Sequence, residues 1–499
     1  MEMPATLTKA LTSVALVGTL ALAGCSAGTT ASSSTSTTTT TSSSSAAATA
    51  VATASGTTVA SVISYDTHYD ADDLTWDAST EVTIDLSNPT ATDGVTVENG
   101  VITITAAGNY RLAGTLADGQ VVVAAGDEDV VRLILDNASI TNSDGAAIDA
   151  ESANETIIYT EAGTTNTVTD GFTYAATGEE DPDAALYART DLTLAGEGTL
   201  TVTGNYGDGI ASGDGLTIAG GIIKVTAADD GIKGKDYVDI LGGIIEVTAT
   251  SDGIKATNDT DAERGWVRLL DGTVTISAGD DGFKSERELE IAGGTLTIKE
   301  SVEAIEGQYL TISGGVTNAT SSDDGINATI PSTTATTTFG GMNQVVDAFI
   351  SITGGELTLN VEGDGLDSNG TAEIFGGTVI VNGPSTGGNA ATDATGGLTI
   401  TGGTLIQGDR GDMFEGMEGA YAQFSASVSS GDTVTVTNSS GEVVAEYTST
   451  KTISQVVVAG SSVTEGETYT ISVNGSEAGT ATATSGAAAG GMGGFGRRP

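Results

Sequence analysis

The sequence has very little of several residue types, and each shortage argues against a class of protein. Its 499 residues include one cysteine, one histidine, six prolines and 4% aromatic residues, and 17 basic residues stand against 66 acidic ones, for a formal net charge of −49. One cysteine cannot form a disulfide scaffold or a cysteine–histidine zinc site. So much negative charge repels phosphate, so we expect no nucleic-acid partner. Hydrophobic residues still make up 38% of the chain, which is enough for a core, and the 70 glycines predict many tight turns.

The amino-terminal residues are typical of an exported bacterial lipoprotein. Lys9 precedes the apolar run Ala10–Leu22, which is too short to predict a membrane-spanning helix. The run ends in Leu-Ala-Gly-Cys, a lipobox in which Cys25 would carry the lipid. We therefore predict a signal peptide at residues 1–24, a Ser/Thr-rich linker at residues 25–60, and a protein lipid-anchored to the bacterial membrane and exposed at the cell surface. The alternative is an ordinary secretory signal with a chance cysteine.

A segment of about 22 residues repeats along the middle of the chain. Six copies align on a glycine pair, in which Asp271 replaces one glycine, and an acidic residue stands ten positions after the first member of each pair. Apolar and polar residues alternate on both sides of the pair, which is the period of a β-strand. Three short strands and three turns per copy predict one coil of a parallel β-helix, with the glycine pair at a sharp corner. The copies begin at Leu216, Val238, Val267, Leu289, Leu310 and Ile350.

The predicted fold class is therefore all-β. We expect a solenoid of about a dozen such coils over residues 95–418, with aliphatic side chains stacked in its core. Residues 419–482 contain hairpin-like segments and predict a small antiparallel β module, and residues 483–499 a glycine-rich tail. Residues 61–94 are predicted to form an N-terminal cap that includes Tyr65, His68, Tyr69 and Trp76.

Equivalent residues of successive coils stack, so the repeated acid should form a column. Carboxylates ~4.8 Å apart repel by about 1 kcal/mol per pair in water and by several times more at lower dielectric. Three positions after the acid, some copies carry lysine and can neutralise it; later copies do not, and there Ca²⁺ with oxygen ligands is the candidate. The alternative is that each Asp-Gly only caps a turn.

The predicted metal ligands are Asp229, Asp230, Asp252, Asp280, Asp281, Glu303, Asp323, Asp324 and Asp364. The lysines that either pair with these acids or bind the carboxylates of a ligand are Lys233, Lys255 and Lys284.

The repeat, its Asp-Asp-Gly-Ile-Lys turns and the lead-in Gly108–Ile148 resemble a family of secreted bacterial carbohydrate-binding-domain proteins. The resemblance covers roughly Thr80–Glu418. It implies a right-handed parallel β-helix like that of pectate lyases, association with calcium, and binding of acidic polysaccharide such as polygalacturonate without clear catalysis. Glu303 and Thr386 stand where the family pattern has aspartate.

These features together predict a surface-tethered, calcium-dependent, non-catalytic binder of acidic, pectin-like polysaccharide. Two alternatives stay open. A calcium-dependent polysaccharide lyase on the same scaffold would need a basic residue, for which Arg264, Arg268 and Arg287 are candidates. A structural or adhesive cell-surface rod would use cations only to stabilise the stack of coils.

Overall fold

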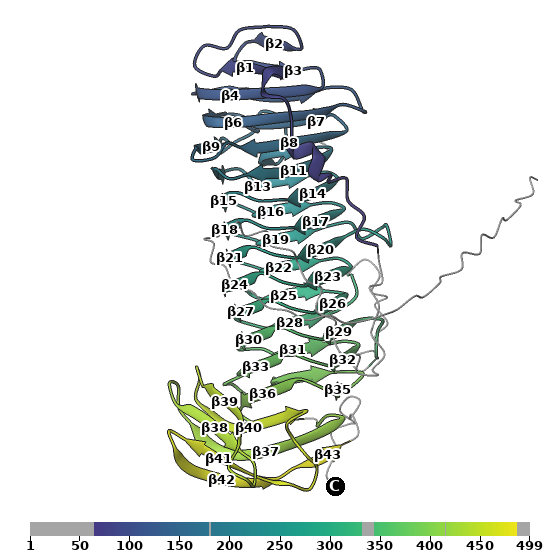
Figure 1. Ribbon diagram of the computed structural model, residues 1–499, viewed down its shortest axis with the longest axis vertical. Helices are drawn as coiled ribbons and strands as arrows, with labels where there is room; N and C mark the ends of the chain where they lie inside the picture. The colour runs from purple at the N-terminus through teal and green to yellow at the C-terminus, as the bar shows by residue number, and fades with distance from the viewer. Residues whose placement is uncertain (1–63, 179–180, 332–343, 415, 487–499) are drawn as a thin grey trace, which may run out of the picture. The chain divides into compact units, whose positions relative to one another are not determined.

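The computed structural model describes residues 64–178, 181–331, 344–414 and 416–486 (Figure 1). The predicted signal peptide, the whole of the predicted linker and Cys25 lie outside these residues. Within the described part of the chain, no helix is long and apolar enough to cross a membrane.

The described chain is all-β and winds as a parallel β-helix (Figure 1). Each regular coil contributes three strands in chain order, which pair with the equivalent strands of the coils before and after it. We call the three resulting rows ladder 1, ladder 2 and ladder 3. From β7 to β36 the described strands make ten complete coils of three. The predicted solenoid is therefore confirmed.

Ladder 1 is a 13-stranded sheet, parallel throughout except for the antiparallel pair β2 and β3 at its start. From β16 to β31 each of its strands is the three-residue segment that begins two positions after the repeated acid. They are β2 (Val95–Glu98), β3 (Val101–Ile104), β5 (Gln120–Ala124), β7 (Ile148–Ser152), β10 (Ala184–Ala188), β13 (Asp208–Ser212), β16 (Ile232–Gly234), β19 (Ile254–Ala256), β22 (Phe283–Ser285), β25 (Ile305–Gly307), β28 (Ile326–Ala328), β31 (Leu366–Ser368) and β34 (Thr392–Ala394).

Ladder 2 follows ladder 1 in each coil and belongs to the larger sheet. Two short 3₁₀ helices, Ala71–Leu74 and Ala78–Thr80, precede its first strand. The strands are β1 (Glu81–Asp85), β4 (Gly108–Leu116), β6 (Val130–Thr141), β8 (Glu155–Thr160), β11 (Asp191–Gly196), β14 (Gly215–Ile218), β17 (Tyr237–Ile240), β20 (Trp266–Leu269), β23 (Glu288–Ile291), β26 (Tyr309–Ile312), β29 (Phe349–Ile352), β32 (Thr371–Ile374) and β35 (Leu398–Ile400).

Ladder 3 closes each coil, and the long strand β6 takes part in ladders 2 and 3 because it pairs with both β8 and β9. The strands of ladder 3 are β9 (Thr165–Thr169), β12 (Thr199–Gly204), β15 (Ile222–Ala227), β18 (Ile244–Ala249), β21 (Thr273–Ser277), β24 (Thr295–Glu300), β27 (Val316–Thr320), β30 (Glu356–Asn360), β33 (Thr378–Asn382) and β36 (Thr404–Asp409).

The core of the β-helix is a set of aliphatic columns, one residue per coil in each. In ladder 1, side chains at one register position succeed one another along the stack and are at most 1% exposed. Stacked branched side chains fill a narrow interior without the volume of large rings, which explains why a chain with few aromatics folds. This column contains Ile210, Ile232, Ile254, Phe283, Ile305, Ile326 and Leu366.

The glycine pairs form the corner between ladders 2 and 3. The second glycine of each pair is left-handed, with φ values such as +98° at Gly221 and +102° at Gly243. A Cβ on Gly243 would lie 3.0 Å from the carbonyl oxygen of Gly221 in the previous coil. The first glycine of this pair has more room, since a Cβ on Gly242 would meet its nearest atom at 3.9 Å. The first position is more crowded in later copies, where a Cβ on Gly293 would clash with the carbonyl oxygen of Leu270.

We expect the two adjacent glycines to respond differently to alanine. Gly243→Ala should cost about 1–3 kcal/mol, because alanine is strained at positive φ and its methyl group crowds the neighbouring coil. Gly242→Ala should stay within about 0.5 kcal/mol of the wild type or stabilise slightly. Urea unfolding of both variants measures the difference, and equal costs would contradict this account of the corner.

The carboxyl-terminal region is an antiparallel β module that covers the last coil, as predicted. Strand β40 pairs antiparallel with β36, so the open edge of ladder 3 is not left free. Strand β43 lies within the predicted tail and pairs with β37; residues 487–499 lie outside the described residues. The module has its own apolar core and contains β37 (Gly419–Val428), β38 (Thr433–Thr437), β39 (Val443–Thr448), β40 (Ile453–Gly460), β41 (Thr468–Val473), β42 (Ser476–Thr482) and β43 (Thr484–Gly486).

The N-terminal aromatic residues lie along the side of the stack, and their predicted placement in an end cap is wrong. Tyr65 packs edge-to-face on Trp266, and His68 lies 3.3 Å from Asp191. The parallel stack also begins earlier than residue 95, because β1 already pairs with β4. Tyr65 and His68 thus find ring and carboxylate partners on the outer face of ladder 2, while Trp76 donates its indole N–H to Glu81 on the first strand of that ladder.

Candidate functional site

The repeated acids form a column at the start of the ladder 1 strands. Strand register places residues 210, 232, 254, 283, 305, 326 and 366 on top of one another, so the acids two positions before them also stack. The predicted column geometry is confirmed. Its members are Asp208, Asp230, Asp252, Asp281, Glu303, Asp324 and Asp364.

One oxygen of the column aspartates bonds to the protein backbone. The amide of Asp230 donates to Oδ1 of Asp208 at 3.0 Å, and the amide of Asp252 donates to Oδ1 of Asp230 at 3.1 Å. Asp281 and Asp364 donate in the same way to the preceding aspartate of the column. Each such aspartate therefore joins two coils through Oδ1 and keeps Oδ2 for another partner. The structural role of these aspartates is therefore to link successive coils, and it uses one of the two carboxylate oxygens.

Lysines occupy the remaining oxygens in the first part of the column. Lys255 Nζ lies 2.5 Å from Oδ2 of Asp230 and 3.1 Å from Oδ2 of Asp252, so it bridges two coils. Lys233 pairs with Asp208 and Asp183, and Lys284 with Asp281 and Glu306. Burial alone would lower the pKa of Lys255, but the two carboxylates raise it above its ordinary value. We call Asp208, Asp230, Asp252 and Asp281 with these lysines the lysine-paired segment.

Three places along the column hold carboxylates close enough to share one cation. Within each group, one oxygen per residue lies within 4.8 Å of the others. Two of the groups combine successive column acids with the exposed acid that precedes one of them. Oxygen-only sets of this kind suit Ca²⁺, which takes carboxylate ligands in flexible geometry. Each of the three groups also includes a carboxylate that is paired with a lysine of the column. The groups are Asp208, Asp229 and Asp230; Asp252, Asp280 and Asp281; and Asp281, Glu303 and Glu306.

Beyond Lys284 the column has no lysine. The register slot that holds Lys255 and Lys284 continues as Glu306, Asn327, Asp367 and Asp393, so a cation is replaced by neutral or acidic side chains. No ion pair to Glu303, Asp324, Asp364, Asp367 or Asp393 occurs within the part of the chain that the structure describes. We call these five residues the lysine-free segment.

Burial raises the pKa of the lysine-free carboxyls, as it also raises the pKa of Asp208 and Asp281 to about 7 in the lysine-paired segment. Burial, the largest cause, together with neighbouring carboxylates raises the pKa of Asp364 to about 7 and that of Asp367 to about 8. Burial also raises the pKa of Glu303 to about 7, although Asn327 donates a hydrogen bond of 2.9 Å to it. Ionising these groups together at neutral pH is therefore costly unless a cation joins them.

The sequence analysis found most of the site but not all of it. Asp323, Asp324 and Asp364 do not form a three-carboxylate group of the kind above among the described residues. Asp183, a partner of Lys233, comes from an irregular earlier coil, and Asp393 from an irregular later one. Alignment of residues 392–394 with residues 366–368 would have placed Asp393 beside Asp367.

The arginines considered for a lyase belong to another part of the molecule. Arg268 donates two hydrogen bonds to Asp239, at 2.9 and 2.6 Å, on the outer face of ladder 2. Arg264 pairs with Asp236 at 3.5 Å, in the loop before that ladder. Arg287 donates a hydrogen bond of 3.4 Å to the backbone of Asp259. Their positive charges are thus directed to partners outside the acid column.

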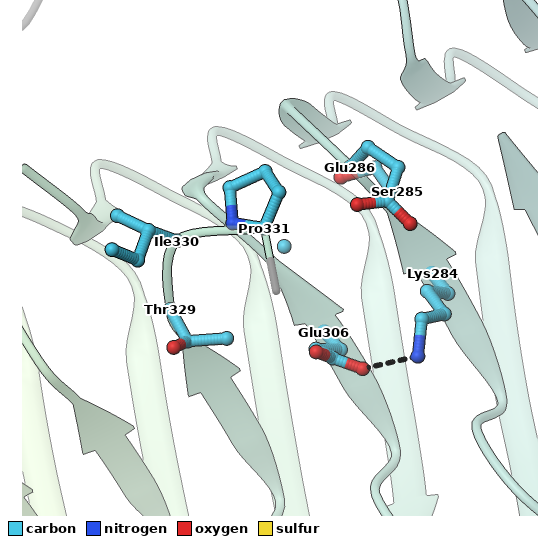
Figure 2. Close-up of a pocket in the computed structure, with 8 residues that line it drawn as sticks. Lys284, Ser285, Glu286, Glu306, Thr329, Ile330 and Pro331 are labelled. Atoms are coloured by element: carbon cyan, nitrogen blue, oxygen red, sulfur yellow. Dashed lines mark ion pairs between the residues drawn. The ribbon is translucent and has the colours of Figure 1, made fainter. Parts of the chain in front are cut away.

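A small pocket lies beside the column (Figure 2). Its volume is about 140 Å³, and it lies between the end of β22 and the turn after β28. Figure 2 shows the ion pair of Lys284 with Glu306 at one side and Ile330 and Pro331 at the other. The last lysine of the lysine-paired segment, Lys284, thus lines this pocket.

Comparison with known proteins finds part of this chain similar to carbohydrate-binding-domain proteins. A family model described as "Carbohydrate-binding domain-containing protein" matches residues 98–345, which include the column from Asp208 to Asp324. A protein of that description from Acetivibrio thermocellus is 38% identical over 145 residues, which are 29% of this chain and 51% of that protein. This chain therefore spans about half the length of that relative. The solved structure of a polysaccharide lyase-like protein from C. thermocellum is 31% identical and covers 50% of this chain and 96% of that one, with a TM-score of 0.43.

Proposed function

We propose that this protein binds acidic polysaccharide of the polygalacturonate type through calcium ions held along the acid column, without catalysing a reaction. We further propose that it is exported and held at the cell surface by a lipid on Cys25. The observation that carries the function is the lysine-free segment, where stacked, half-buried carboxylates lack any basic partner among the described residues.

The spacing of the column suits a linear polymer with regular carboxylates. Successive coils are ~4.8 Å apart, so the column offers carboxylates at short, even steps along the stack. A polyuronate is also negatively charged, and two like-charged arrays repel unless cations lie between them. Calcium takes six to eight oxygens, so one ion can accept ligands from the column and from the sugar at once. The match of residues 98–345 to a carbohydrate-binding family supports this proposal.

The lysines suit a structural role in this mechanism better than direct recognition. Each of the three contacts two protein carboxylates, so binding a uronate would require it to leave one of them. The lysine-paired segment is then neutralised by the protein itself, and the lysine-free segment is the part that needs an external cation.

The test is retention in affinity gels that contain polygalacturonate, with calcium or with a chelator. We expect the wild type to be retarded only with calcium, because the polymer and the column share no other cation. Asp364→Asn with Asp367→Asn should lose most of the retardation. The matched control is Glu446→Gln with Glu477→Gln, which removes the same charge from exposed strands of the C-terminal module.

Other outcomes point to the alternatives. Retardation that survives the chelator would contradict calcium bridging. Calcium-dependent stability without any retardation would indicate a structural rod. Steady release of unsaturated uronates would indicate a lyase and overturn the non-catalytic proposal.

A further inference from the structure

Residues 64–77 form a segment that we call the strap, which runs along ladder 2. It is the purple segment that passes β8 and β11 in Figure 1. Tyr65 reaches Trp266 and Glu288, His68 reaches Asp191, and at the other end Trp76 packs edge-to-face on Tyr159. The strap therefore crosses the strands from β23 back to β8, against the direction in which the coils advance.

Side chains hold the strap in place. Tyr65 donates from its hydroxyl to Oε1 of Glu288 at 2.8 Å, and the His68 amide donates to the Tyr237 hydroxyl at 3.1 Å. Between described residues, no backbone–backbone hydrogen bond joins the strap to ladder 2. Its described side chains are exposed or half-buried. A segment held in this way can leave without breaking any strand pairing.

The strap covers an aromatic pair that faces outward from the β-helix. Val238 and Val267 point into the core, so their neighbours Tyr237 and Trp266 point away from it. The rings of Tyr237 and Trp266 stack at 4.7 Å with an interplanar angle of 11°. They are only 2% and 0% exposed, and Tyr65 of the strap packs against them. Arg264 and Arg268 also lie over these rings, and the Tyr237 ring packs on Gly215 of the preceding coil, so the strap supplies part of their burial.

The surface beneath the strap has the groups that recognise a sugar ring. Trp266 offers a broad apolar ring, and its indole N–H has no hydrogen-bond partner among the described residues. Glu288 lies on the next strand of the ladder, where it accepts the hydroxyl of Tyr65. Tyr65 thus packs edge-to-face on Trp266 and donates its hydroxyl to Glu288. A pyranose has C–H groups that can take the place of this ring contact and hydroxyls that can take the place of the phenol.

We propose that the strap is a releasable cover over a second glycan-binding surface, centred on Tyr237 and Trp266, that takes neutral sugar residues. Neutral sugar is favoured because both arginines beside the pair already contact carboxylates, Arg268 that of Asp239 and Arg264 that of Asp236. Asp191, Asp214 and Asp236 add negative charge around the aromatic pair. This surface is separate from the acid column and needs no calcium, so it goes beyond the function proposed above.

Fluorescence tests whether the strap can leave. The chain has two tryptophans, so Trp76→Phe leaves Trp266 as the only reporter. Adding Tyr65→Ala and His68→Ala should shift its emission to longer wavelength and raise acrylamide quenching several-fold. Asp72→Asn is the matched control, since Asp72 is an exposed strap residue whose side chain makes no described bond to ladder 2. Circular dichroism and thermal unfolding establish that each variant is folded, and Tyr65→Phe, which removes only the hydroxyl, provides a milder second variant.

Affinity gels with hydroxyethylcellulose, run in chelator, test the surface itself. We expect the strap variant to be retarded several-fold more than its Trp76→Phe parent, and a further Trp266→Leu to remove the gain. If Trp266 stays shielded in both strap variants, the strap is a fixed part of the fold and the proposal is wrong. If Trp266 becomes accessible without added retardation, the covered surface does not bind neutral glycan. Because the chelator removes calcium, these gels do not measure binding through the acid column. Either negative result would therefore leave the proposed calcium-dependent function unaffected.

Discussion

Replacing Lys255 with methionine should destabilise the protein by about 3–5 kcal/mol at pH 7 in chelator. The substitution keeps the length of the side chain but removes the ammonium group that lies between Asp230 and Asp252. These two aspartates are 3% and 4% exposed. Removing one partner of a buried ion pair leaves uncompensated charge, which is why the expected loss is large. Urea unfolding measures it.

The control is the corresponding change at an exposed pair. Lys224 contacts Glu246 at 2.6 Å, with side chains 44% and 53% exposed, so Lys224→Met should change stability by at most about 0.5 kcal/mol. Calcium should restore part of the stability of Lys255→Met, because the ion can take the place of the ammonium group. Wild-type stability of Lys255→Met in chelator would show that the lysines do not neutralise the column.

The lysine-free segment should make stability fall as pH rises. Burial, with neighbouring carboxylates, raises the pKa of Asp367 from its ordinary value of 3.8 to about 8 and that of Asp364 to about 7. At pH values between the ordinary pKa and the raised pKa, each of these carboxyls is protonated in the folded chain but ionised in the unfolded chain. Their stabilisation is complete below pH 4 and is lost as pH rises through 7 and 8, at about 1.4 kcal/mol per pH unit for each such carboxyl.

Thermal unfolding in chelator between pH 5 and pH 8 measures this dependence. We expect the melting temperature of the wild type to fall across the range and that of Asp367→Asn to fall less. Glu477→Gln, an exposed residue of β42, should follow the wild type. Calcium should flatten the wild-type curve, because a bound cation favours the ionised carboxylates. A wild-type curve that is flat in chelator would contradict the account of the lysine-free segment.

The repulsion between stacked carboxylates is thus offset by lysines in one part of the column and not in the other. Between Asp208 and Asp281 the protein supplies its own cations, and beyond Glu303 it does not. The change occurs at the slot where Lys284 is followed by Glu306. A polymer lying along ladder 1 would meet a neutralised stretch first and a cation-dependent stretch after it.

The regular coils and their register could be predicted from the sequence because the repeat is local and periodic. Residues 232, 254 and 283 stack as their spacing indicated, even though a loop lengthens the second interval. The loop bulges outward at the corner, so it leaves the register of the strands intact. The pairing of Lys255 and Lys284 with the acids three positions earlier was also visible, since both belong to one short turn. Lys233 instead pairs with Asp208 of the preceding coil and not with Asp230.

Other features could not be read in this way. Asp183 contacts Lys233 across 50 residues of sequence, and the strap contacts Glu288 across more than 200. Neither Tyr65 nor His68 belongs to a repeat, so the repeat does not predict where either residue lies. Tyr65 lies against Trp266 and Glu288, and His68 lies beside Asp191, and these contacts form only in the folded chain.

The sequence by itself determined the all-β coil, its glycine corners and the stacked acids, because a 22-residue period forces like residues onto like positions once strands pair. The tertiary structure alone decided which carboxylates obtain a cation and which ring surface is covered. Those outcomes depend on burial and on contacts between segments far apart in the chain, where the strength of a charge or the exposure of a ring is set by what lies next to it in space.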